Sequence, residues 1–182
     1  SVWIDGHLQL LVDPEDLIAG HTNESDLALF QHPLRDCVYS EIALCLEEGI
    51  GDKTELITQE ASYRALCYPA QNGLWACGLI VRRHTADIEE LNRLWWKEFL
   101  VGSARDQISF PLVARCITNT PISIIPGNVL GINKYVRLIN HTAWRKASGL
   151  YPIYEDRGKI HNQCEELRSL CGGSLERFRF DE

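Results

Sequence analysis

Leu74-Trp75-Ala76-Cys77-Gly78-Leu79-Ile80-Val81 forms a long apolar run that follows the turn signal Asn72-Gly73. A short continuous apolar run bounded by turn residues is typical of a strand with both faces covered. The run ends in Arg82-Arg83-His84, and a helix is predicted from Thr85, because Ile88, Leu91, Trp95 and Phe99 recur at helical spacing. A buried strand followed directly by an amphipathic helix indicates a sheet covered by helices.

The rest of the chain repeats this alternation of short strands and helices. Strands are predicted at residues 2–4, 27–30 and 122–125, and helices at 13–19, 38–48, 54–66, 85–99 and 105–116. Asp13-Pro14, Asp36 and Thr54 are expected to begin helices, and Gly49 is expected to end one. The pattern predicts an α/β domain over residues 1–127, with an irregular C-terminal extension over residues 128–182.

Composition narrows the possible functions. The chain has 182 residues and a net charge of −7, which argues against a general nucleic-acid binder. No apolar run reaches the length of a membrane span. Seven cysteines without a CxxC pair predict reduced thiols and a cytoplasmic protein. The abrupt start at Ser1 and the lack of methionine lead us to expect a fragment of a longer chain.

Arg105-Asp106-Gln107 opens an otherwise apolar helix and permits two interpretations. Charged residues at a helix start can simply cap it. Alternatively, the triplet presents a guanidinium, a carboxylate and an amide to a polyhydroxylated or anionic ligand.

Polar side chains also follow three of the predicted strands. Asp5 ends the first strand, where a carboxylate can hold a divalent ion or a ribose, although a plain Asp-Gly turn is the alternative. His32 and Arg35 follow the second, and Arg35 is suited to clamping a phosphate or carboxylate. Arg82 and His84 end the third, and three cationic or potentially cationic residues there are hard to explain as surface alone.

Trp95-Trp96 and Glu98 give a further candidate. Helical spacing places Trp95 in the core, whereas Trp96 points elsewhere. A tryptophan face beside a carboxylate can hold a sugar ring, so Trp96 and Glu98 are predicted to bind substrate.

These blocks together resemble a glycosyltransferase-type domain found in plant mucilage-related hexosyltransferases and bacterial polysaccharide-locus proteins. The resemblance covers roughly residues 1–116 and rests on several motifs in order. They are Val2-Trp3-Ile4-Asp5-Gly6, Phe30-x-His32-Pro33-x-Arg35-Asp36-Cys37-x-Tyr39, Gln59-x-x-x-Tyr63, Pro69, Gly73-Leu74, Arg82-Arg83-His84, Leu91-Asn92-x-x-Trp95-Trp96-x-Glu98 and Arg105-Asp106-Gln107-x-Ser109-Phe110.

The resemblance implies a GT-A-like mixed sheet flanked by helices, incomplete at its N-terminus, that binds a nucleotide-sugar. It assigns a divalent metal, Mn²⁺ or Mg²⁺, to Asp5 and places Asp106 and Gln107 beside the reacting sugar or the acceptor. By the same resemblance, a set of substrate-binding residues would line the donor and acceptor cleft: His32, Arg35, Arg82 and His84. Arg105 would stabilise the diphosphate or orient Asp106 through an ion pair. His141 is the candidate for a late metal-binding histidine. Gly6 and His7 follow Asp5, so the usual Asp-x-Asp pair lacks its second carboxylate.

The function implied is transfer of a hexose from a nucleotide-sugar to a glycan or polysaccharide, with metal assistance, in polysaccharide biosynthesis. Two alternatives stay open. One is a non-catalytic carbohydrate-binding or scaffold domain on the same fold. The other is a ceramidase-like hydrolase, as described for a plant relative.

Overall fold

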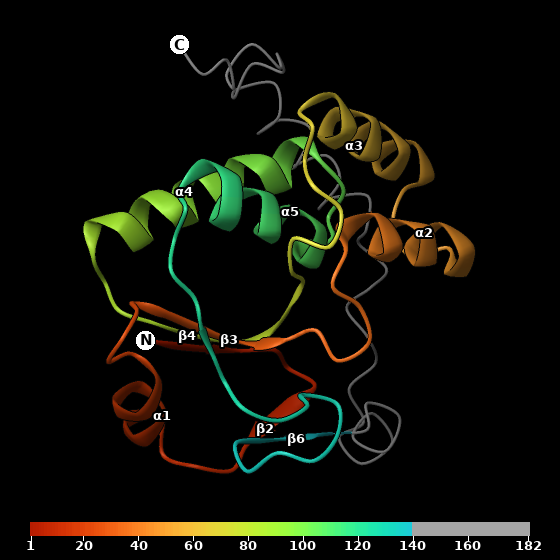
Figure 1. Ribbon diagram of the computed structural model, residues 1–182. Helices are drawn as coiled ribbons and strands as arrows, with labels where there is room; N and C mark the ends of the chain where they lie inside the picture. The colour runs from red at the N-terminus through yellow and green to blue at the C-terminus, as the bar shows by residue number, and fades with distance from the viewer. Residues whose placement is uncertain (140–182) are drawn as a thin grey trace.

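The computed structural model describes residues 1–139 of the chain and confirms a mixed α/β architecture with helices flanking a mixed sheet (Figure 1). The elements in chain order are β1 (Val2–Ile4), β2 (Leu8–Leu10), α1 (Pro14–His21), β3 (Leu27–Gln31), α2 (Val38–Glu48), α3 (Lys53–Ala65), β4 (Trp75–Arg82), α4 (Ala86–Val101), α5 (Asp106–Leu112), the π-helical turn η1 (Val113–Ile117), β5 (Ser123–Ile124) and β6 (Val136–Leu138).

The main sheet has the strand order β1-β4-β3-β5, so β4 lies inside it and β1 lies at an edge. β4 runs antiparallel to both β1 and β3, and β5 pairs parallel to β3. Six of the eight β4 residues are buried, as the apolar run predicted. The apolar run therefore places β4 inside the sheet, because a strand buries that many side chains when both of its faces are covered.

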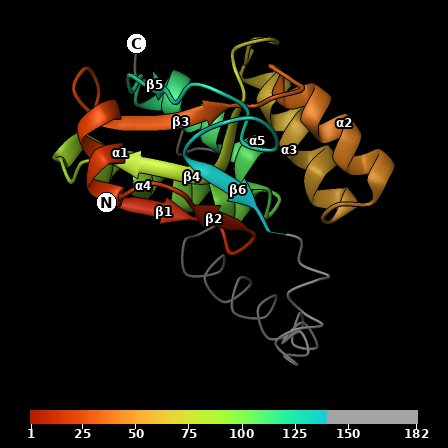
Figure 2. The same ribbon diagram turned by 90° about the horizontal axis from the view of Figure 1, so that it is seen from below.

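Different elements cover the two faces of this sheet. In Figure 1, α4 and α5 cover one face, and α1 with the β2–β6 pair lies on the other. α2 and α3 form a pair beside α5, and Figure 2 shows them together at one end of the sheet. A separate apolar cluster joins the pair to α5 through Ile42, Leu56, Tyr63, Ile108 and Leu112.

Helix ends follow the sequence in part. Asp13 caps α1, and Gly49 ends α2 in the left-handed conformation, as expected. Two predicted caps were wrong. Cys37 rather than Asp36 holds the N-cap position of α2, because the chain stays extended through residue 37. Asp52 rather than Thr54 caps α3, since its carboxylate accepts hydrogen bonds from the backbone N–H groups of residues 54 and 55.

The predicted helix from Arg105 changes character along its length. Pro111 lies inside α5 and has no N–H to donate, and the chain widens into the π-helical turn η1 two residues later. The expected irregular pattern beyond Asn128 is also broken by a strand. β6 pairs with β2, and Val129, Tyr135 and Val136 join the core beneath the sheet. The remainder of the predicted extension, with the candidate His141, lies outside the described residues.

Within residues 1–139, no helix has the length and apolar character needed to cross a lipid bilayer.

Candidate functional site

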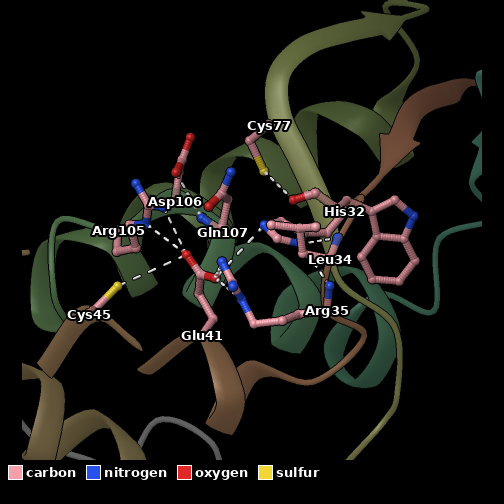
Figure 3. Close-up of polar contacts among 10 residues, drawn as sticks. His32, Leu34, Arg35, Glu41, Cys45, Cys77, Arg105, Asp106 and Gln107 are labelled. Atoms are coloured by element: carbon pink, nitrogen blue, oxygen red, sulfur yellow. Dashed lines mark hydrogen bonds and ion pairs between the residues drawn. The ribbon is translucent and has the colours of Figure 1, made fainter. Parts of the chain in front are cut away.

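A buried carboxylate on α2, Glu41, gathers three of the predicted site residues (Figure 3). Arg35 donates from Nε and Nη2 to Oε2 of Glu41, both at 2.7 Å. Arg105 donates from Nε at 3.1 Å and from Nη2 at 2.8 Å to Oε1. His32 lies with Nε2 3.8 Å from Oε2. We call Glu41, Arg35 and Arg105 the ionic clamp; it ties α2 to the loop after β3 and to the start of α5.

The ionic clamp keeps Glu41 charged although its side chain is fully buried. Burial raises the pKa of Glu41, but the hydrogen bonds and charges of Arg105 and Arg35 outweigh it and hold that pKa below its ordinary value. Two guanidinium groups share one carboxylate, so the clamp has a surplus positive charge. Both arginine side chains are partly exposed, so their surplus positive charge can attract an anionic ligand from solvent.

His32 belongs to this cluster as a neutral group. Its Nδ1 accepts hydrogen bonds from the backbone N–H groups of Leu34 and Arg35, at 3.3 and 3.1 Å. Burial lowers the pKa of His32; Glu41 opposes this shift, and the two arginines reinforce it. The histidine thus shapes the loop after β3, and its Nε2–H faces Glu41.

Asp106 lies on the other side of Arg105 and points away from Glu41 (Figure 3). It is the first residue of α5, and its Oδ1 accepts a hydrogen bond of 2.8 Å from the backbone N–H of Gln107. Burial is the main cause that raises the pKa of Asp106, and the negative charge of Asp5 adds to the rise. The two interpretations of this residue are therefore compatible. The Asp106 carboxylate accepts a hydrogen bond within the first turn of α5, and its pKa is raised.

Gln107 presents a second unusual group in the same segment. Its side-chain oxygen Oε1 is buried, and no residue of the described range donates a hydrogen bond to it. A buried acceptor without a partner is costly and needs an explanation such as a bound water or ligand.

Asp5 directly follows β1, and its backbone N–H donates to the carbonyl of Gly78 on β4. Its Oδ2 lies 3.0 Å from Nδ1 of His7, and both side chains are partly exposed. Residues 1–139 contain no group of three or more His, Cys, Asp or Glu side chains able to hold a metal ion. The pair supplies one oxygen and one nitrogen donor. The carboxylate suits a hard ion such as Mg²⁺ or Mn²⁺ that takes most of its other ligands from substrate phosphates and water, whereas an imidazole nitrogen is a ligand that Mg²⁺ seldom takes.

A groove of about 630 Å³ runs along the β1 edge of the sheet beneath α4. Asp106 lines it together with four aromatic side chains and the paired Arg82 and Asn92. Two of the predicted binding residues, Arg82 and Trp96, therefore share this groove with Asp106.

Two other predicted binding residues lie elsewhere. Glu98 is buried and accepts a 2.7 Å hydrogen bond from the hydroxyl of Tyr63, so its carboxylate faces the protein interior rather than a ligand. His84 is exposed after the end of β4. Trp95 packs edge-on against Phe110 and donates to the hydroxyl of Ser109, which confirms its predicted place against the core.

Glu41, which organises the cluster, was not predicted from the sequence. A signal was present, because Glu41 falls on the apolar face of α2 between Val38, Ile42 and Cys45. A charged residue on such a face is rarely buried without a partner. Its partners lie 6 and 64 residues away along the chain, so the spacing alone did not identify them.

Comparison with known proteins gives one match. The family model TOD1/MUCI70, glycosyltransferase-like domain, matches residues 1–141. No curated protein and no solved structure matches the chain.

Proposed function

This chain belongs to the TOD1/MUCI70 glycosyltransferase-like family, and we propose that it transfers a hexose from a nucleotide-sugar donor to a glycan or polysaccharide acceptor. The observation that supports this best is the position of Asp106. Its carboxylate lines the aromatic groove and is also close enough to Asp5 for the charge of Asp5 to raise its pKa. One carboxylate thus lines the groove, the candidate acceptor side, and interacts electrostatically with Asp5, the candidate donor side.

Asp106 is proposed as the general base. An acceptor hydroxyl attacks the anomeric carbon of the donor sugar, the bond from that carbon to the phosphate oxygen breaks, and the hydroxyl proton passes to Asp106. The nucleoside diphosphate leaves with the bonding electron pair. A raised pKa makes this carboxylate a stronger base than an ordinary aspartate.

Asp5 and His7 are the residues that would hold a divalent ion, Mn²⁺ or Mg²⁺, against the donor diphosphate. When bound, the ion would offset the negative charge that develops on the departing nucleoside diphosphate. His7 supplies a nitrogen donor at the position where the usual second carboxylate is absent.

The ionic clamp has two proposed roles. Arg105 holds the start of α5 against Glu41 and so positions Asp106, rather than pairing with Asp106 itself. The surplus positive charge of Arg35 and Arg105 attracts the donor diphosphate. Gln107, with its unpaired Oε1, would accept a hydrogen bond from a sugar hydroxyl.

The setting of this activity is proposed to be polysaccharide biosynthesis in the cytoplasm. The five cysteines in the described range are free thiols, which supports a reducing compartment.

The test uses the full-length protein and four nucleoside diphosphates, those of uridine, guanosine, adenosine and cytidine, each with Mn²⁺. We expect at least one pair to raise the melting temperature, because a ligand that binds only the folded state stabilises it. Asp5→Ala should abolish the shift. Asp106→Asn should keep the shift but lower the transfer rate by about 10² to 10⁴-fold, the usual contribution of a general base.

Asp36→Asn is the matched control, since Asp36 is exposed and lies outside both the ionic clamp and the groove. It should behave like the wild type in both measurements. The absence of a shift with all four nucleotides would overturn the proposal.

A second candidate is a non-catalytic carbohydrate-binding domain on the same fold. The observation in its favour is that Arg35 and Arg105 already direct two hydrogen-bonding nitrogens each to Glu41. This candidate predicts that glycan binding persists without metal and that Asp106→Asn leaves cellular function unchanged.

A further inference from the structure

Two of the aromatic side chains that line the groove along β1, Trp3 and Trp96, lie outside the hydrophobic core. Trp3 on β1 is 42% exposed and Trp96 on α4 is 54% exposed, although both have large apolar rings. Trp96 stacks on Phe99 with 5.6 Å between ring centroids and 10° between ring planes. The result is a platform of nearly parallel rings on α4 facing the same groove as Trp3.

Polar groups lie in the same groove. Arg82 donates from Nη1 to Oδ1 of Asn92 at 2.8 Å, which fixes the guanidinium along the groove wall. Asp106 adds a carboxylate. The groove therefore offers flat apolar surfaces together with both hydrogen-bond donors and acceptors.

A hexopyranose ring matches this combination. One face of such a ring presents C–H groups, which pack against the negative face of an aromatic ring. Its hydroxyl groups need donors and acceptors around the rim, and Arg82, Asn92 and Asp106 supply both kinds. A volume of about 630 Å³ lies within the ordinary range for small-molecule sites.

We propose that this groove is the acceptor subsite and that the terminal hexopyranose of the acceptor glycan stacks on Trp3 and Trp96, with one hydroxyl directed at Asp106. The assignment of the groove to the acceptor rests on the proposed transfer reaction. It goes further in assigning a binding role to Trp3, which had none from the sequence, and in naming the part of the acceptor that is recognised.

The main experiment measures sugar binding without any donor or metal, so it can fail separately from the proposed function. The full-length protein is titrated with the methyl β-pyranosides of glucose, galactose and mannose, and binding is followed by saturation-transfer NMR and tryptophan fluorescence. We expect at least one to bind in the millimolar range and Trp96→Ala to weaken that binding at least about tenfold. Trp96→Phe should retain most of the affinity, because it keeps an aromatic face.

Val101→Ala is the control on the same helix, since Val101 is 52% exposed and does not line the groove. It should bind sugar as the wild type does. The unchanged shift of the Trp96→Ala variant with Mn²⁺ and a nucleoside diphosphate would show that the donor side is intact.

Three outcomes would overturn the inference. They are the absence of binding by all three sugars, equal binding by Trp96→Ala and the wild type, and self-association of the wild type that Trp96→Ala abolishes. The last result would mean that the groove contacts a second copy of the chain.

Discussion

Two buried glutamates, Glu41 and Glu98, flank the segment that carries Asp106. Their surroundings shift the pKa of the carboxyl group in opposite directions. Glu41 lies between two arginines in the ionic clamp, and its pKa falls below the ordinary value. Glu98 meets neutral partners, and burial raises its pKa despite hydrogen bonds from Tyr63 and Gln59. The charge of a buried carboxyl is thus decided by its partners rather than by the depth of burial.

The partners of Glu98 form a second clamp, which we call the neutral clamp: Gln59, Tyr63, Glu98 and Ser103. The hydroxyl of Tyr63 donates to Glu98 at 2.7 Å, and Nε2 of Gln59 donates to that hydroxyl at 2.9 Å. Both the backbone N–H and the hydroxyl of Ser103 donate to Oε1 of Gln59. The neutral clamp therefore fixes the chain at Ser103, and the ionic clamp fixes it two residues later at Arg105.

The two clamps stabilise the segment around Arg105 through different kinds of interaction. The ionic clamp has full charges that lose their stabilisation if one partner is removed. The neutral clamp contains only dipoles and a carboxyl whose pKa is raised. We expect the ionic clamp to fail with a larger loss of stability.

Glu41→Gln should have the largest effect. An amide cannot balance two guanidinium groups, and breaking a buried ion pair from one side costs about 3 to 5 kcal/mol. Urea unfolding of the variant measures this loss in the free energy of unfolding. Glu60→Gln is the control, because Glu60 pairs with Arg64 on the surface of α3 and its loss should change stability very little. A loss below about 1 kcal/mol for Glu41→Gln would mean that the ionic clamp does not hold the fold.

The two clamps also show what could be predicted from sequence. The apolar run before Arg82 was sufficient to predict β4, because burial on both faces leaves a continuous apolar signal. Local cap chemistry predicted Asp13 and Gly49 for the same reason: the signal and its effect lie within a few residues. Arg105, by contrast, was predicted to face a diphosphate or Asp106, since nothing near it in sequence indicated Glu41 as its partner.

Distance along the chain explains the other gaps. β6 pairs with β2 across 128 residues in a register that places Leu8 opposite Leu138 and Gln9 opposite Arg137, and short strands with mixed polarity have weak local signals. Glu98 was predicted to bind substrate because it adjoins two tryptophans. Helical geometry instead turns it toward Tyr63 on α3, 35 residues earlier. Local patterns identify candidate polar residues, whereas long-range packing decides which of them meet a ligand.

Tyr63→Phe should have an intermediate effect. The change removes the hydroxyl between Gln59 and Glu98 and leaves buried polar groups without that partner, which costs about 1 to 3 kcal/mol. Tyr68→Phe is a close control, because Tyr68 packs beside Tyr63 but its hydroxyl belongs to neither clamp. Urea unfolding should show a loss for Tyr63→Phe and little change for Tyr68→Phe. Equal losses in the two variants would show that the neutral clamp adds nothing specific.

Glu98→Gln should have the smallest effect, visible as a change in pH dependence. Because the pKa of Glu98 is raised in the folded protein, the folded state retains its proton more firmly than the unfolded state. This contribution to stability is complete below the ordinary value of 4.5 and is lost as the pH rises through the folded pKa. The glutamine variant has no such proton, so its stability relative to the wild type should rise over this window by about 1.4 kcal/mol per unit of difference between the two pKa values. Glu41→Gln should show the reverse trend: its deficit should shrink as the pH falls from 4.5 through the lower pKa of folded Glu41, since the unfolded wild-type chain then binds a proton before the folded one does. Parallel stability curves for Glu98→Gln and the wild type between about pH 4 and pH 8 would contradict the contrast between the two clamps.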